Sequence, residues 1–537
     1  MRKYLAGVFL IQTALSSNIG LSKVKTNIKN NKIERVIDAS FSKTNSITLN
    51  NKKFIEFDLA GETSGYGAIL YKVGAPRIPV IRFYAYGKVD VDFNSEEKQI
   101  LSLSAQISPN QESALKSKKA TKTFSMDNEI YNSDALYPAG PRVKVEEAGS
   151  IRGQKRFLVT LIPMKVRPKS GQISYVSKFK VTSELPKEEN NKGKTIAFVT
   201  AQRFENSPAL KAYSNLKAEQ GFNVENIVVG SEVSTAEAIR SRLQISLQER
   251  NLKFALLIGD IEDVPSYDQA SIYGPSDHYF RAIDTNDYAS DINGPDIGVG
   301  RISARTEKEL SDILEKYTQY RSMQNLKQWQ KQAAFLATDD RYEIAEGSHN
   351  YAIDNYTSPA GFEGIFPENL TPGGDKLYAI TYRAPNNIVQ QALQAGRAII
   401  NYSGHGATTF WDAPRVTQSD VRAIQDTQAM PFVVSNACIT GDFRVEESFA
   451  ETWQRHPFGA VMFWGSMDNT YWDEDDILER SMYDGIFQEG KSSFSEITQH
   501  ALSEHWRHYG GAGKSAYYWE TYTLFGDPSL ELASSAK

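Results

Sequence analysis

The spacing of apolar residues divides the chain into two regions with different periodicity. Between residues 21 and 185, short runs alternate apolar with polar residues, and Gly, Pro and Asn separate the runs. Alternation with a period of two, bounded by turn residues, is typical of strands that bury one face. No long helical pattern intervenes, so we predict an all-β sandwich over 21–185. The clearest runs are KKFIEFDLAG, VIRFYAYGKVDVDF, KRFLVTLIPMKV and QISYVSKFKVTSEL.

From residue 195 onward, continuous apolar runs alternate with segments of helical spacing. This alternation predicts right-handed βαβ units and a parallel sheet. The length of the region predicts two adjoining doubly wound α/β subdomains, 195–330 and 331–537. The apolar runs include TIAFVTA, KFALLIGD, RAIINYSGHG and PFVVSNAC, and the helical segments include SPALKAYSNLKAEQG and TEKELSDILEKYTQYRSMQ.

Two polar segments interrupt this pattern. PKEENNKGK, residues 186–194, contains no apolar residue beyond Pro186 and separates the two regions. Such a tract is typical of a linker that proteases reach easily. The second segment, residues 111–128, is polar and rich in lysine, which predicts an exposed loop within the β region.

The N-terminus has the order of a secretory signal. Arg2 and Lys3 precede a mostly apolar stretch from Tyr4 to Leu15, and small residues follow it. This order of a basic start, an apolar core and a stretch of small residues predicts a signal peptide over 1–20. We therefore expect a secreted protein, extracellular or periplasmic. A buried first strand is the alternative interpretation of the same residues.

Composition narrows the classes of partner. The chain has 537 residues, 40% hydrophobic and 23% charged, with a formal net charge of −5. An acidic balance of this kind does not favour binding to nucleic acid. After the N-terminus no apolar run approaches the ~20 residues that span a bilayer, so we expect no membrane span.

Cys438 is the only cysteine in the sequence. A single cysteine cannot form a disulfide within the chain, so in an exported protein it indicates intermolecular pairing or a free reactive thiol. Burial as a small apolar residue is the alternative. The residues around Cys438 decide between these interpretations.

Three predicted strands end in residues that can react. One ends at Asp339 and Asp340, one at His405, and one at Cys438. Active groups gather at the carboxyl ends of strands in open α/β sheets. An imidazole activates a neighbouring thiol, and a carboxylate orients the imidazole. Taken alone, His405 is more often a loop histidine and Cys438 a core residue, but their pairing favours a cysteine nucleophile.

Glycines on both sides of His405 allow the backbone to approach a substrate closely. Attack on an amide carbonyl creates an oxyanion, which needs backbone N–H donors. We predict that the N–H groups of Gly406 and Cys438 form this oxyanion hole.

The motifs NYSGHG and VVSNACITGDF resemble the signature of the gingipain family of cysteine peptidases, in the clan that also holds caspases and legumains. Other segments occur in the same order as in that family. They are SDALYPAG (133–140), ALLIGDIEDVP (255–265), DIGVGRISAR (296–305) and YTLFGDPSLEL (522–532). The resemblance implies a caspase-like catalytic fold and a secreted zymogen whose β-rich pro-domain is its own intramolecular inhibitor.

The resemblance also implies roles for individual residues. His405 matches the catalytic histidine and Cys438 the nucleophile. The third catalytic residue matches Asp340 best, with Asp339 next. No cofactor is needed for this chemistry, although many members of the family bind calcium. Acidic residues near Asp260, Glu262 and Asp263 and within 287–296 are candidates for binding calcium, as solvated loops of the same composition also are.

The known gingipains cleave after Arg or Lys, which implies an acidic substrate pocket. Glu346 falls near the family's acidic position, and Ser403 precedes the catalytic histidine. The segment SMDNTYWDEDD (466–476) is expected to form another wall, with Trp472 as its apolar face. Its acids are equally typical of a solvated helix start.

Activation is expected in the linker, by cleavage after Lys187, Lys192 or Lys194. If the enzyme prefers basic residues, it can make this cut itself. One lysine of the 116–122 loop, which contains Lys116, Lys118, Lys119 and Lys122, is a candidate to occupy the pocket before activation. A flexible solvated loop is the alternative.

Two other functions remain open at this point. One is a specialised processing peptidase or transpeptidase of the secretion-system sortase type, which would use the same catalytic residues. The other is a catalytically inactive binding protein, which the intact His405 and Cys438 disfavour. Our prediction is a secreted cysteine endopeptidase acting on proteins and peptides after basic residues.

Overall fold

The computed structural model describes residues 24–41, 45–60, 67–93, 98–100, 103–117, 123–187, 193–268, 273–322, 328–425, 427 and 429–532. These residues group into two compact units. The first comprises described residues up to 113, those between 121 and 189, and Ser503–Ser515; the second comprises the rest. The predicted signal peptide, 1–20, lies outside the described residues. Among the helices in these ranges, none is long and apolar enough to cross a bilayer.

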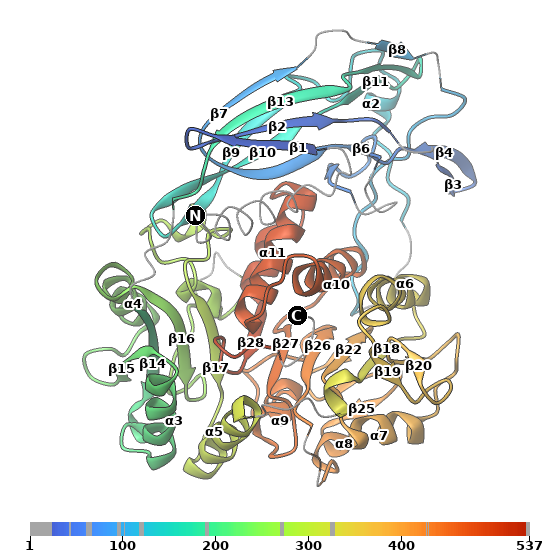
Figure 1. Cartoon of the computed structure of the whole chain (residues 1–537). Helices are drawn as coiled ribbons and strands as arrows, with labels where there is room; N and C mark the ends of the chain where they lie inside the picture. The colour runs from blue at the N-terminus through green and yellow to red at the C-terminus, as the bar shows by residue number, and fades with distance from the viewer. Residues whose placement is uncertain are drawn as a thin grey trace. The chain divides into compact units, whose positions relative to one another are not determined.

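The first unit is built mainly of antiparallel strands (Figure 1). Its six-stranded sheet has the order β1 (Val24–Lys29), β2 (Lys32–Asp38), β13 (Lys178–Glu184), β7 (Ile81–Phe93), β10 (Gln154–Leu161), β9 (Val143–Ile151). A second sheet has the order β11 (Met164–Arg167), β12 (Gln172–Tyr175), β8 (Lys98–Ile100). The remaining elements are the pairs β3 (Asn45–Leu49) with β4 (Lys52–Glu56) and β5 (Ile69–Leu70) with β6 (Ile78–Pro79), and the single-turn helix α2 (Asn128–Tyr131).

Alternating burial explains these strands. In β13 the residues Phe179, Val181 and Ser183 are buried while their neighbours face outward. Phe179 and Val181 join an apolar cluster with residues of β2, β7 and β10, including Phe83. A second apolar cluster lies among β6, β11 and β12. The predicted β-rich region is therefore confirmed.

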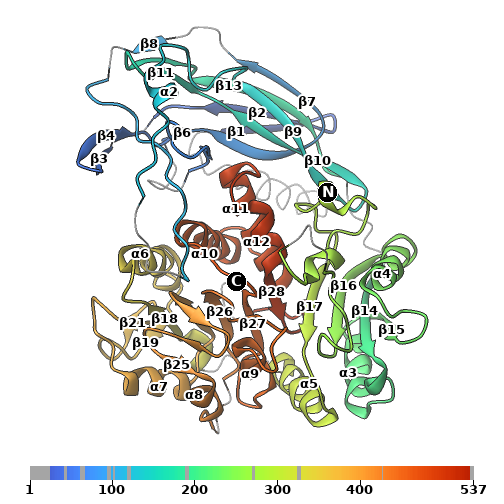
Figure 2. The ribbon, with the colours of Figure 1, turned by 180° about the vertical axis from the view of Figure 1, so that it is seen from behind.

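The second unit contains one ten-stranded sheet (Figures 1 and 2). Its order is β15 (Phe222–Val229), β14 (Lys194–Ala201), β16 (Leu252–Ile258), β17 (Gly298–Ile302), β28 (Tyr522–Phe525), β27 (Met462–Ser466), β26 (Phe432–Asn436), β22 (Ile399–Ser403), β18 (Ala333–Ala337), β21 (Asp375–Tyr378). A short pairing joins β19 (Glu363–Gly364) to β20 (Thr371–Pro372). A small three-stranded sheet has the order β23 (Gly406–Ala407), β24 (Phe410–Trp411), β25 (Val416–Thr417).

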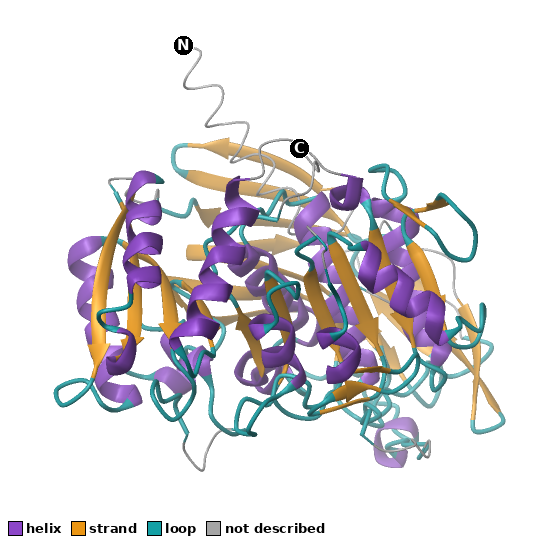
Figure 3. Ribbon diagram, turned by 90° about the horizontal axis from the view of Figure 1, so that it is seen from below, coloured by secondary structure: helices purple, strands orange, loops and turns teal. Residues whose placement is uncertain are grey.

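Helices pack along these strands (Figure 3). They are α3 (Pro208–Glu219), α4 (Ala236–Arg250), α5 (Glu307–Ser322), α6 (Tyr342–Ala352), α7 (Asn386–Ala395), α8 (Gln418–Arg422), α9 (Phe449–Arg455), α10 (Trp472–Phe487), α11 (Phe494–Tyr509) and α12 (Ser515–Thr521). Short 3₁₀ turns are η1 (Gln202–Phe204), η2 (Asp277–Phe280), η3 (Tyr288–Ser290) and η4 (Gln328–Lys331), and η5 (Ile353–Thr357) is a π turn.

Local chemistry accounts for several of these helix starts. Ser207 caps α3, whose first residue is Pro208, and its hydroxyl accepts a hydrogen bond from the Leu210 amide. Ser448 and Glu451 form a reciprocal capping box at α9. Side-chain caps of this kind satisfy amide groups that have no partner within the helix, each stabilising the helix by about 1 kcal/mol.

The direction of the strands determines where functional residues gather. Every pairing in the sheet is parallel except that of β27 with β28, which is antiparallel. The carboxyl ends of β18, β22, β26 and β27 therefore meet at one edge, and those of β14, β16 and β17 at the opposite edge. All residues of β18, β22 and β26 are buried, as expected for strands covered on both faces.

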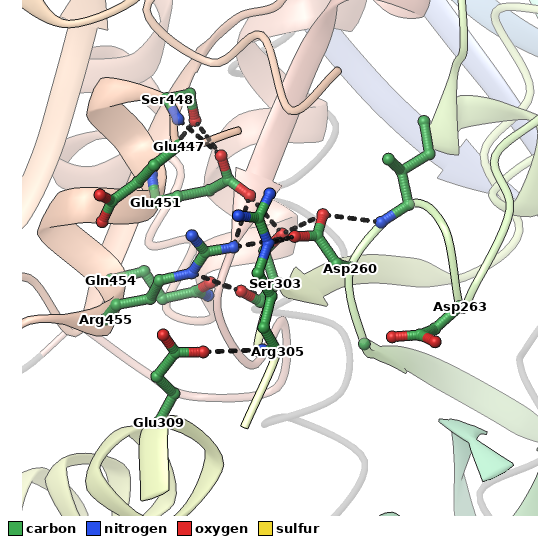
Figure 4. Close-up of polar contacts among 12 residues, drawn as sticks. Asp260, Asp263, Ser303, Arg305, Glu309, Glu447, Ser448, Glu451, Gln454 and Arg455 are labelled. Atoms are coloured by element: carbon green, nitrogen blue, oxygen red, sulfur yellow. Dashed lines mark hydrogen bonds and ion pairs between the residues drawn. The ribbon is translucent and has the colours of Figure 1, made fainter. Parts of the chain in front are cut away.

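At the opposite edge a buried polar network joins the two halves of the sheet (Figure 4). Asp260, after β16, forms ion pairs with Arg305 and with Arg455 of α9. Glu451 accepts a hydrogen bond from Ser303, after β17, at 2.6 Å and pairs with Arg455 at 2.9 Å. Two arginines thus neutralise Asp260, one of the residues that the sequence offers as a candidate calcium ligand.

The predicted α/β class with a parallel sheet is confirmed, with one difference in its assembly. The sequence predicts a sheet in each of two subdomains, but the strands form one continuous sheet. The last strand, β28, joins the halves because it pairs with β17 through Phe525 and with β27 along its length. The boundary at residue 330 stays a prediction.

Candidate active site

Three neighbouring strands deliver the predicted catalytic residues to one edge of the sheet. β18, β22 and β26 lie side by side and run parallel. Asp340 follows β18, His405 follows β22, and Cys438 follows β26. The arrangement expected from the spacing of the motifs is therefore present in the fold.

His405 lies between two acceptors. Its Nε2 atom donates to Oδ2 of Asp340 at 3.1 Å, and its Nδ1 atom donates to the carbonyl oxygen of Lys116. Asp339 instead accepts a hydrogen bond from the Thr338 hydroxyl. Of the two predicted carboxylates, the structure places Asp340 on the histidine.

Cys438 is buried, with 1% of its surface exposed. Its sulfur accepts a hydrogen bond from the Thr470 amide at 3.3 Å. Burial raises the pKa of the Cys438 thiol and nearby Asp475 acts in the same direction, whereas the Thr470 amide and Lys116 lower it. The net rise favours the protonated thiol, which is a weak nucleophile.

Gly406 lies directly against the turn that carries Cys438. A Cβ atom at position 406 would be 2.9 Å from the Cys438 carbonyl oxygen and 2.8 Å from Cγ2 of Thr440. Only glycine therefore allows the two turns to approach this closely. The role of the Gly406 and Cys438 amides as an oxyanion hole stays a prediction.

A short segment of the chain pairs with residues beside the site through its main chain. The described residues 114–117 group with the α/β unit. The Lys116 amide donates to the Thr470 carbonyl at 2.9 Å, and the Trp472 amide donates to the Ala114 carbonyl at 3.0 Å. Leu115 thus pairs with Tyr471 in an antiparallel bridge. Peptides bound by strand addition make the same main-chain contacts.

The Lys116 side chain is completely buried in a pocket of complementary polarity. Its ammonium lies 2.6 Å from Oδ2 of Asp475 and donates to the Asn436 carbonyl at 2.7 Å. The Ser403 hydroxyl is 3.5 Å away, and the Trp472 ring centre is 4.8 Å away. Ser403 and Trp472 therefore lie beside the lysine, while their role in lining a substrate pocket stays a prediction.

Asp475 is the acid that contacts the lysine. The role of Glu346 in a substrate pocket stays a prediction, and no contact between Glu346 and Lys116 is found among the described residues. Glu346 lies on α6, where its carboxylate accepts hydrogen bonds from the amide and hydroxyl of Thr381. The second oxygen of Asp475 accepts hydrogen bonds from two tyrosine hydroxyls, at 2.8 Å and 2.7 Å, so its orientation is fixed. These donors are Tyr518 and Tyr522.

Several residues of the site are not singled out by the sequence. Asp475 lies in the acidic run DEDD, which the sequence predicts only as a pocket wall or a helix start. Asn436 precedes the cysteine by two residues in its motif, and Thr470 follows β27. Asn436 and Thr470 act through main-chain atoms, which leave no signal in side-chain chemistry.

The predicted activation lysines lie partly within the described residues. Lys187 is exposed, and its amide donates to the Gln154 side chain at 3.0 Å. Lys194 is exposed at the start of β14. Lys192 lies outside the described residues, as do Lys118, Lys119 and Lys122 of the loop. Cleavage at these sites stays a prediction.

Three carboxylates of the region before β17 could supply ligands to a cation. Asp284, Asp291 and Asp296 have oxygens within 4.8 Å of one another. Two of these lie in the 287–296 range named from the sequence. Asp263, by contrast, pairs with Arg203. Binding of calcium stays a prediction.

The sequence of the α/β region matches known proteins. Residues 189–533 match the family model described as peptidase family C25. Gingipain R2 of Porphyromonas gingivalis is 26% identical over 371 residues, covering 66% of this chain and 47% of that protein. Lys-gingipain of the same organism is 25% identical over 357 residues, covering 60% and 20%. The chain thus spans about half or less of the length of these relatives.

Solved structures show the same fold. The Arg-specific cysteine proteinase gingipain R superposes with a TM-score of 0.55 at 23% identity, covering 66% of this chain and 81% of that one. The complex of the pro- and mature domains of RgpB from Porphyromonas gingivalis gives 0.54 at 22% identity, covering 64% and 81%. At this identity the similarity establishes the fold alone.

The matched region contains both motifs on which the resemblance rests, and more than half of the chain fits the family model. The prediction of the family is therefore confirmed: the chain belongs to peptidase family C25, the gingipain family of cysteine peptidases.

Proposed function

We propose that the chain is a secreted cysteine endopeptidase, made as a zymogen, that hydrolyses the peptide bond after lysine. One observation carries this proposal: the Lys116 ammonium lies buried against Asp475 at the edge of the sheet that bears Cys438 and His405. The main chain around Leu115 pairs with residues 470–472 in the manner of a peptide bound by strand addition. Lys116 therefore marks the position of the residue on the N-terminal side of the bond to be cleaved, P1.

The proposed reaction is acyl transfer through the thiol. The Cys438 sulfur attacks the carbonyl carbon, and the amides of Gly406 and Cys438 hold the developing oxyanion. His405 takes the thiol proton and passes it to the leaving amine. Asp340 orients the imidazole. Water, deprotonated by His405, then releases the acyl group and restores the thiol.

The pocket favours lysine over arginine. An ammonium is a compact charge with three donors that point in different directions. The ammonium of Lys116 meets a carboxylate, a carbonyl and a hydroxyl, belonging to Asp475, Asn436 and Ser403. A planar guanidinium favours two parallel hydrogen bonds to one carboxylate. The second oxygen of Asp475 is already used by Tyr518 and Tyr522.

A scan of fluorogenic peptides that differ only in P1 tests this function. We expect lysine to give kcat/KM at least ~10-fold above arginine and at least ~100-fold above norleucine, which has a similar stem without charge, because the buried ion pair contributes several kcal/mol. Equal hydrolysis of lysine and norleucine peptides would contradict the assignment of the pocket. Absence of hydrolysis by the processed chain would favour an inactive binding protein.

The position of Lys116 supports the proposed latency of the full chain. Its carbonyl oxygen accepts a hydrogen bond from His405, so the imidazole is not free to act as a base toward Cys438. The thiol is buried beneath the same segment and its pKa is raised. In sequence, residues 114–117 interrupt the β-rich unit. We propose that this unit presents the segment as an inhibitor until the chain is cut in the 187–194 linker.

Replacing Lys116 by methionine is expected to release this inhibition. Methionine keeps an apolar stem but leaves Asp475 buried without its cation, which costs about 3 kcal/mol or more. Because Cys438 is the only cysteine, alkylation by iodoacetamide reports its exposure by a single mass change. In the full chain we expect alkylation about 100-fold faster than in the wild type, by the usual conversion of free energy to rate.

A matched control for this experiment is Lys155→Met, since Lys155 is an exposed lysine of the β-rich unit that pairs with exposed Glu147. Its alkylation rate should equal that of the wild type. If Lys116→Met also leaves the rate unchanged, the segment does not protect the thiol. The intact mass, read in the same spectrum, shows whether the labelled molecules are full-length or already cleaved.

A further inference from the structure

One face of α10 carries polar side chains from the lysine pocket onward toward the carboxyl end of the helix. Asp475, Glu479 and Tyr483 are spaced four residues apart, so their side chains share this face. Asp475 contacts Lys116, Glu479 contacts Asn436 of β26, and Tyr483 contacts Asn401 of β22. The helix therefore has a polar contact with the strands at each turn beneath the pocket.

Glu479 is joined to the substrate position through a single residue. Its Oε2 atom accepts a hydrogen bond from Nδ2 of Asn436 at 2.8 Å. The main-chain carbonyl of Asn436 accepts a hydrogen bond from the Lys116 ammonium at 2.7 Å and from the Gly404 amide at 3.2 Å. Asn436 is also two residues before Cys438. The orientation of this residue thus affects both the pocket and the turns that carry the reacting groups.

We propose that Glu479 is a positioning residue of the lysine pocket: it fixes Asn436 so that the Asn436 carbonyl meets the ammonium of P1 lysine. This role rests on the proposed function, because it assumes that a substrate lysine binds as Lys116 does. The polar contacts of the ammonium are with Asp475, Asn436 and Ser403. Glu479 acts on the lysine through the amide side chain of Asn436.

The environment of Glu479 supports a specific role. The side chain is fully buried, where a carboxyl group without partners would be costly. Burial raises the pKa of Glu479 to about 8, with Asp476 acting in the same direction and Lys116 and Arg480 lowering it. Its other oxygen lies 3.3 Å from Nε2 of His349.

His349 is also fully buried, and burial lowers its pKa to about 3, with Lys116 and Arg480 acting in the same direction. The titratable and charged groups around Glu479 belong to four elements and the bound segment. They are Asp475, Asp476, Arg480 and Tyr483 of α10, His349 of α6, Tyr378 of β21, Tyr522 of β28, and Lys116.

The coupling between Glu479 and the ammonium is reciprocal. The charge of Lys116 lowers the pKa of Glu479, so the ionised form of Glu479 must bind a P1 lysine more tightly than the neutral form. The pKa of about 8 applies with the ammonium in place and is higher without it, so the KM for lysine peptides should fall as pH rises above about 8. The fall is about tenfold for each pKa unit by which the ammonium lowers the pKa of Glu479.

The test compares three variants of the full chain after processing, with active sites counted by alkylation of Cys438. Glu479→Gln keeps an oxygen that can accept from Asn436, whereas Glu479→Leu and Asn436→Ala each remove the hydrogen bond. The measured quantity is kcat/KM for the lysine peptide divided by kcat/KM for the norleucine peptide. At pH 7 we expect this ratio in Glu479→Gln to lie within about threefold of the wild-type ratio. The other two should lower this ratio at least ~10-fold, mainly through KM, because the Asn436 carbonyl is then no longer held against the ammonium of P1 lysine.

Three further readouts separate positioning from a purely structural role. The double variant Glu479→Leu with Asn436→Ala should lose no more than either single variant, since both act through one contact. The dependence of KM on pH above about 8 should disappear in Glu479→Gln. Asp484→Asn, a change on the same helix away from the pocket, should keep the wild-type ratio and pH dependence.

The proposal is overturned if a folded Glu479→Leu chain keeps the wild-type ratio, if Glu479→Gln loses as much as Glu479→Leu, or if Asn436→Ala keeps the ratio. Should Glu479→Leu fail to fold, the other two variants decide. Failure of the proposed function would give a different result, because the wild type itself would then hydrolyse lysine and norleucine peptides equally.

Discussion

Replacing Cys438 by alanine is expected to abolish peptide hydrolysis, with a fall in kcat of roughly 10⁴-fold or more. The reason is that the covalent step has no nucleophile, although the pocket and the proposed oxyanion donors remain. Substrate binding should survive, so the Kd of a lysine peptide should change by less than about threefold. The measurements are steady-state hydrolysis and fluorescence binding on the same preparation.

The same variant tests whether the chain processes itself. Full-length Cys438→Ala, expressed where no other protease is present, should remain intact, whereas the wild type is cut at Lys187, Lys192 or Lys194. Trimming of the alanine variant at these lysines would show that another protease makes the cut. Residual hydrolysis near the wild-type level would exclude the thiol mechanism altogether.

Cys438→Ser provides the matched control. It keeps the size of the side chain and the contact with the Thr470 amide, but a hydroxyl is a much weaker nucleophile in a site built for a thiol. Both variants should unfold at the wild-type temperature, because the buried volume changes little. Loss of activity with unchanged stability assigns the effect to chemistry.

The positions of the predicted catalytic residues could be derived from the sequence because they follow from strand periodicity. His405 and Cys438 come directly after buried apolar runs, and parallel strands bring their carboxyl ends to one edge. The choice between Asp339 and Asp340 needed the structure, because adjacent residues at a strand end point in different directions. Of these two, Asp340 is the one that contacts His405.

The pocket acid could not be predicted from spacing alone. Asp473, Glu474, Asp475 and Asp476 form one acidic run at the start of α10, where the helix dipole favours acids in any case. Contact with Lys116 distinguishes Asp475 from the other three: Glu474 is equally buried, at 1% exposed, but the ion pair with Lys116 is made by Asp475. Distance along the chain from Asp340 favours Glu346, but α6 turns the Glu346 side chain toward Thr381.

The single sheet could not be predicted for a related reason. β28 comes from the far end of the chain, yet it lies between β17 and β27 in the middle of the sheet. Its pairing connects Phe525 with Arg301 and with Phe463. Periodicity identifies a strand but carries no information about which distant strand it pairs with.

Replacing Asp475 by asparagine is expected to have the second-largest effect, confined to lysine substrates. We expect kcat/KM for P1 lysine to fall by about 10²- to 10³-fold, since removing one partner of a buried ion pair costs about 3–5 kcal/mol. Norleucine peptides should change by less than about tenfold, because they place no charge beside residue 475. The ratio of lysine to norleucine hydrolysis is therefore the measurement.

Asp473→Asn is the control, because it removes an equal charge from the first turn of the same helix at an exposed position. Its selectivity should equal that of the wild type. A similar loss in both variants would mean that the general negative field of the helix start, and not the contact with Asp475, selects lysine.

In the unprocessed chain the same Asp475→Asn change leaves Lys116 buried without its carboxylate, so alkylation of Cys438 should accelerate there as it does in Lys116→Met. Weaker binding of substrate lysine and weaker self-inhibition should appear together, because one pocket serves both.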